Sequence, residues 1–89
     1  MTDEYLIKSA LDALPPESSA IIADELARAD PDLLAQLRST HEPTDAQRQA
    51  VNELLAQAVV RSMEADWVPN AHGLAVERAV KVFLEHWPL

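Results

Sequence analysis

Apolar residues recur along the chain at helical spacing, in segments that prolines separate. Within each segment leucine, isoleucine, valine or alanine returns every three or four residues, which places these side chains on one face of an α-helix. The six prolines lie between the segments or at their ends. Proline is tolerated in the first turn of a helix and disrupts a helix interior. The pattern therefore predicts an all-α fold.

Five helical segments are expected from this pattern. They cover about residues 3–14, 17–29, 31–39 and 45–65, and a last stretch from Ala71 or Gly73 to Trp87. The chain has 89 residues, which is enough for one small core and one domain. We therefore expect residues 1–89 to form a compact single-domain bundle of four or five helices.

Local capping chemistry marks three of the expected helix starts. Asp30-Pro31 combines an N-cap residue with proline at the first helical position. Thr44 and Gln47 have the spacing of a capping box, in which each side chain binds the backbone N–H of the other residue. Asn70 is the expected cap of the last helix.

The apolar faces of these segments predict the core. The expected core positions are Ile7, Leu11, Leu14, Ile22, Leu26, Leu34, Leu37, Val51, Leu55, Ala58, Val76, Val80, Phe83 and Trp87. The apolar stripe of segment 45–65 is wide, and a core of this size is marginal on its own. Self-association through segments 45–65 and 71–87, giving a homodimer, therefore stays open.

Composition and charge narrow the classes of function. The chain has no cysteine, no basic stretch after Met1 and no apolar run of the roughly 18 residues that a membrane span needs. These features favour a cytoplasmic protein without membrane contact, and the excess of arginine over lysine suggests a bacterial source. The net charge is −8, and residues 1–44 hold most of it. Such a surface repels nucleic acid and attracts a basic partner, although the same charge is also explained by solubility alone.

The sequence offers few ingredients for catalysis or for cofactor binding. The chain has a single glycine, so a glycine-rich phosphate loop is excluded, and no nucleophile motif is present. His41, His72 and His86 lack the spacing of paired metal ligands. Asp30 and Asp32 fit helix capping better than calcium binding. We therefore expect no enzyme activity, no metal and no cofactor.

Two further features each allow two interpretations. Gln47, Arg48 and Gln49 stand where a DNA-reading helix would carry its contacts, but the acidic front half of the chain opposes binding to phosphates. Trp67 and Trp87 could either fill the core or form contacts with a partner, because tryptophan is frequent in both settings.

The leading hypothesis is a small non-catalytic protein that binds and restrains a protein partner. Size, charge and helix content are similar in general terms to those of immunity proteins, antitoxins and inhibitors. The alternative is a helical dimer that regulates transcription or assembly. The expected partner-binding residues are Glu17, Asp24, Glu25, Asp30, Asp32 and Trp67.

Overall fold

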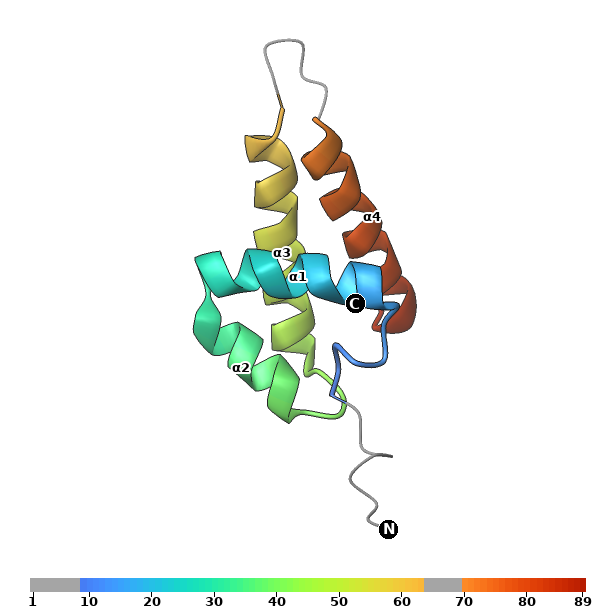
Figure 1. The fold of residues 1–89 in the computed structure, drawn as a ribbon. Coiled ribbons are helices and arrows are strands. Elements are labelled where there is room, and N and C mark those ends of the chain that lie inside the picture. The colour runs from blue at the N-terminus through green and yellow to red at the C-terminus, as the bar shows by residue number, and fades with distance from the viewer. Residues whose placement is uncertain (1–8, 64–69) are drawn as a thin grey trace.

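The computed structural model describes residues 9–63 and 70–89, and within these ranges it contains four helices and no strand (Figure 1). The helices are α1 (Pro16–Ala29), α2 (Pro31–Ser39), α3 (Asp45–Arg61) and α4 (Ala71–His86). Helices α3 and α4 run side by side in opposite directions, and α1 crosses this pair. Helix α1 contacts each of the other three helices. The prediction of an all-α fold is confirmed.

The capping predicted for α2 and α3 is present. The side chain of Asp30 accepts a hydrogen bond of 3.1 Å from the N–H of Leu33, and Pro31 begins α2. Thr44 and Gln47 form both halves of the capping box. The N–H of Gln47 donates to the hydroxyl of Thr44 at 3.1 Å, and the N–H of Thr44 donates to the side-chain oxygen of Gln47 at 2.9 Å. These bonds satisfy donors that the first turn of a helix otherwise leaves unpaired.

Replacing Thr44 with alanine is expected to lower the free energy of unfolding by about 1 kcal/mol, because α3 loses its N-cap hydroxyl. Denaturant melts of the two proteins measure the change. Thr44→Ser keeps the hydroxyl and is expected to melt close to the wild-type midpoint. An alanine variant that also keeps this midpoint would mean that the cap does not stabilise α3.

Residues 9–14 form a single capped turn, whereas a continuous helix was expected up to Leu14. The N–H of Ser9 donates to the carboxylate of Asp12, and the N–H of Asp12 donates to the hydroxyl of Ser9, both at 3.2 Å. This exchange has the pattern of a second capping box, and it begins a turn at Ser9. The rest of that expected helix, residues 3–8, lies outside the described residues.

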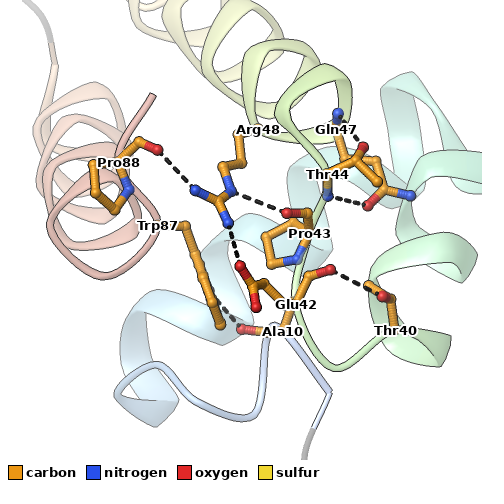
Figure 2. A network of polar contacts seen from close by, with 9 residues as sticks. All are labelled: Ala10, Thr40, Glu42, Pro43, Thr44, Gln47, Arg48, Trp87 and Pro88. Atoms are coloured by element: carbon orange, nitrogen blue, oxygen red, sulfur yellow. Dashed lines mark hydrogen bonds and ion pairs between the residues drawn. The ribbon is translucent and has the colours of Figure 1, made fainter.

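The turn at residues 9–14 is hydrogen-bonded to the rest of the protein through the backbone of Ala10, which is completely buried. Its N–H donates to the carbonyl of Thr40 at 2.8 Å, and its carbonyl accepts from Nε1 of Trp87 at 3.1 Å (Figure 2). Ala10 thus joins the α2–α3 connection to the end of α4.

Helix α3 ends at Arg61, earlier than the expected bound near residue 65. The hydroxyl of Ser62 donates to the carbonyl of Val59 at 2.6 Å, and the N–H of Ser62 bonds carbonyls of the last turn. Residues 64–65 lie outside the described residues. Across the gap, Asn70 caps α4 as predicted, because its side chain accepts from the N–H of Gly73 at 2.9 Å.

The core lies where α1 packs on the other three helices. Most of the expected core positions are buried, while Val80 and Trp87 are only partly buried and Ile7 lies outside the described residues. Four residues of the buried hydrophobic cluster were absent from the expected set: Ala10, Leu33, Val59 and Ala79. Phe83 is the largest completely buried side chain among the described residues.

Candidate binding site

The most unusual side chain in the described structure is the carboxylate of Glu25, which is 9% exposed at the centre of α1. It lies 2.7 Å from Nε2 of His72 on α4 and 3.8 Å from the guanidinium of Arg28. A buried carboxylate is costly unless it is paired, and these two partners compensate for its burial. The contact with His72 also fixes the orientation of the imidazole ring.

A cleft of about 520 Å³ opens beside this pair, where α1 meets the end of α3 and the start of α4. Its polar lining includes Glu25, Arg28, Arg61, Asn70 and His72. Three helices and at least four different hydrogen-bonding groups therefore meet at one recess. Its volume falls in the range of pockets that hold small molecules.

The five predicted partner-binding residues that the structure describes differ in their exposure. Glu17, Asp24 and Asp32 are exposed, and Asp24 forms an ion pair with Arg28. Asp30 is half-buried and caps α2, while Glu25 is buried against α4. We call the three exposed residues, Glu17, Asp24 and Asp32, the acidic face. Trp67 lies outside the described residues.

Arg48, considered above as a possible DNA contact, binds other residues of the same chain. Its guanidinium donates to the carbonyls of Pro43 and Pro88, at 3.0 and 2.9 Å, and pairs with Glu42 at 3.1 Å (Figure 2). It also lies 5.5 Å from the ring centre of Trp87, and only 13% of the side chain is exposed. Arg48 therefore holds the start of α3 against the end of α4.

Gln47, which precedes Arg48, also forms its hydrogen bonds within the chain. Gln47 completes the capping box and donates from its side chain to Gln36 of α2 at 3.0 Å. Of the three residues considered for reading DNA, only Gln49 is exposed.

Trp87 links several parts of the protein and is half-buried. Besides its bond to Ala10 and its contact with Arg48, its ring meets that of His86 edge-on at 4.6 Å. These contacts of Trp87 all lie within the chain, as expected for a residue with a structural role. His86 itself is exposed at the end of α4, where a basic side chain suits the helix dipole.

A metal site and a membrane-spanning helix are both absent from residues 9–63 and 70–89. No group of three or more histidine or acidic side chains is arranged to hold a metal ion there. None of the helices in these ranges has the length and apolar character to cross a membrane. Comparison with known proteins finds no family model, no curated protein and no solved structure that matches the chain.

Sequence interpretation missed the Glu25–His72 contact, although a signal for it exists. Glu25 is three residues after Ile22 and one before Leu26, so it occupies a position on the buried stripe of α1. Its charge suggested exposure, whereas its register indicates burial. Its partner is 47 residues away, and helical periodicity does not reveal a pairing between helices.

Proposed function

We propose that this is a small, non-catalytic protein that binds and restrains a basic protein partner, in the manner of immunity proteins, antitoxins and inhibitors. The observation that carries the proposal is the distribution of charge between two parts of the fold. Described residues from 9 to 44, which include α1 and α2, hold seven acidic residues and two arginines. Helices α3 and α4 together hold four acidic and four basic residues.

This asymmetry gives the surface near α1 and α2 a negative potential that α3 and α4 lack. Complementary potentials speed the encounter of two proteins and exclude wrongly charged partners. Within the acidic face, Arg28 partly neutralises Asp24, while Glu17 and Asp32 form no ion pair with the described residues. We therefore assign the steering of a partner chiefly to Glu17 and Asp32, with Asp24 as an additional contributor.

Reversing the acidic face with Glu17→Lys, Asp24→Lys and Asp32→Lys is expected to slow association with the partner by about tenfold or more at low salt. The salt dependence of the association rate should also become flatter. Partners captured from the native host are first identified by mass spectrometry. Stopped-flow kinetics with the purified partner then give the rates over a series of salt concentrations.

The matched control reverses Glu53, Glu77 and Glu85 to lysine, which changes the net charge equally on exposed positions of α3 and α4. This control should slow association far less than reversal of the acidic face. Equal effects of the two triple variants, or rates that ignore both, would contradict steering by the acidic face. Recovery of DNA or a larger assembly in place of one protein would favour the alternative, a helical dimeric regulator.

A further inference from the structure

The cleft beside Glu25 and His72 is less acidic than the protein as a whole. Arg28 and Arg61 line it from α1 and α3, and Glu25 is the one carboxylate among the lining residues that the structure describes. The chain as a whole carries a net charge of −8. Asp24, outside the lining, also pairs with Arg28, so the arginine of the cleft without a carboxylate partner among the described residues is Arg61. An unpaired guanidinium in a recess favours an anionic ligand over other small molecules.

Some of the hydrogen-bond donors that line this cleft have no acceptor among the described residues. Arg28 is shared between Asp24 and Glu25. Arg61 is exposed and forms no ion pair with any part of the chain that the structure describes. The side-chain oxygen of Asn70 accepts from Gly73, which leaves its NH₂ group for another acceptor. Arginine presents several N–H groups in a planar fork that matches phosphate and carboxylate oxygens.

Glu25 positions part of this donor set and pairs with only one of its two arginines. One oxygen of its carboxylate faces both His72 and Arg28, so the carboxylate holds these two side chains at the edge of the cleft. The ion pairs of the described residues include none between Glu25 and Arg61. The guanidinium of Arg61 therefore remains without a compensating carboxylate among the described residues, although it lines the same recess.

From this arrangement we propose that the cleft binds the phosphate group of a small phosphorylated molecule, with Arg61 as the principal contact and Arg28 and Asn70 as further donors. A tetrahedral phosphate offers three oxygens to such a set, while a carboxylate offers two. The volume of about 520 Å³ leaves room for a sugar-sized remainder beside the phosphate. The acidic face meets this site through the ion pair of Asp24 with Arg28, and Arg61, the principal contact, takes no part in that pair. The proposal stands independently of the proposed protein partner.

NMR titration of the ¹⁵N-labelled full chain tests the site with glucose 6-phosphate, inorganic phosphate and, as the neutral control, glucose. Ionic strength is held constant with sodium chloride. Both phosphates are expected to produce saturable shifts at the amides of Ser62, Asn70 and His72, with a Kd in the millimolar range or below. Glucose should produce none. Stronger binding of glucose 6-phosphate than of inorganic phosphate would show that the remainder of the molecule contributes.

Two variants separate this site from general attraction of anions. Arg61→Gln is expected to weaken binding about tenfold, because a charged donor is lost. Arg78→Gln removes an equal charge from an exposed position on α4 outside the cleft, and it should bind as the wild type does. The proposal is overturned if no saturable shift occurs up to about 50 mM phosphate, or if the two variants weaken binding equally. Both replaced side chains are exposed, so both proteins are expected to fold.

Discussion

Replacing Phe83 with alanine is expected to destabilise the protein by about 3–5 kcal/mol, the largest effect of any single change considered. Phe83 is completely buried on α4, in the core that α1 also enters. Its removal loses the transfer free energy of the ring and leaves a cavity that close-packed helices fill only in part. Domains of this kind have a total stability of about 5–15 kcal/mol, so the loss is a substantial fraction of the whole.

Thermal unfolding followed by circular dichroism measures this effect. A loss of this size corresponds to a fall in Tm of more than about 10 °C for a domain of fewer than 100 residues. Leu74→Ala is the matched control, because Leu74 lies on the same helix and is 42% exposed. The control should change stability by no more than about 0.5 kcal/mol. Similar melting temperatures for the two variants would contradict the position of Phe83 in the core.

The second large effect is expected at Arg48, whose replacement with alanine should cost about 2–3 kcal/mol. Its ion pair with Glu42 contributes little, because the side chain of Glu42 is 67% exposed. Most of the loss comes from the bonds to the carbonyls of Pro43 and Pro88 and from the contact with the ring of Trp87. Denaturant melts give the free energy.

Arg48→Lys distinguishes the geometry of the guanidinium from its charge. A lysine ammonium keeps the charge but cannot reach three separate acceptors in the fixed directions of a guanidinium, so this variant should lose most of the same stability. Arg78→Ala is the control, because Arg78 is exposed on α4. A lysine variant as stable as the wild type would mean that charge alone accounts for the role of Arg48.

Elements that depend on local chemistry could be predicted from the sequence. Asp30 before Pro31, the Thr44–Gln47 pair and Asn70 each act within three residues of their own position, and all three helix starts are where they were expected. The capping box of Ser9 and Asp12 follows the same rule and was available in the sequence. It was missed because the apolar spacing of that segment also fits a continuous helix.

The charged residues that face inward could be predicted only in part. Glu25 and Arg48 both lie on the buried stripes of their helices, Arg48 three residues before Val51 and seven before Leu55. Periodicity applied without regard to residue type would have placed both inside. It would not have named their partners, His72 and Trp87, because those contacts depend on how separate helices pack. The cleft arises from the same packing, so no single segment predicts it.

The hydrogen bonds of the Ala10 backbone also have a consequence for the order in which the protein folds and unfolds. Trp87 and Ala10 are 77 residues apart, so their contact closes nearly the full length of the chain and carries a high entropic cost of formation. We therefore expect this contact to form late in folding, after the helices between its two ends have docked. We also expect the turn at residues 9–14 and the last turn of α4 to open as one cooperative unit. The earliest and the latest described parts of the chain are therefore expected to exchange their amide hydrogens together, through one shared opening.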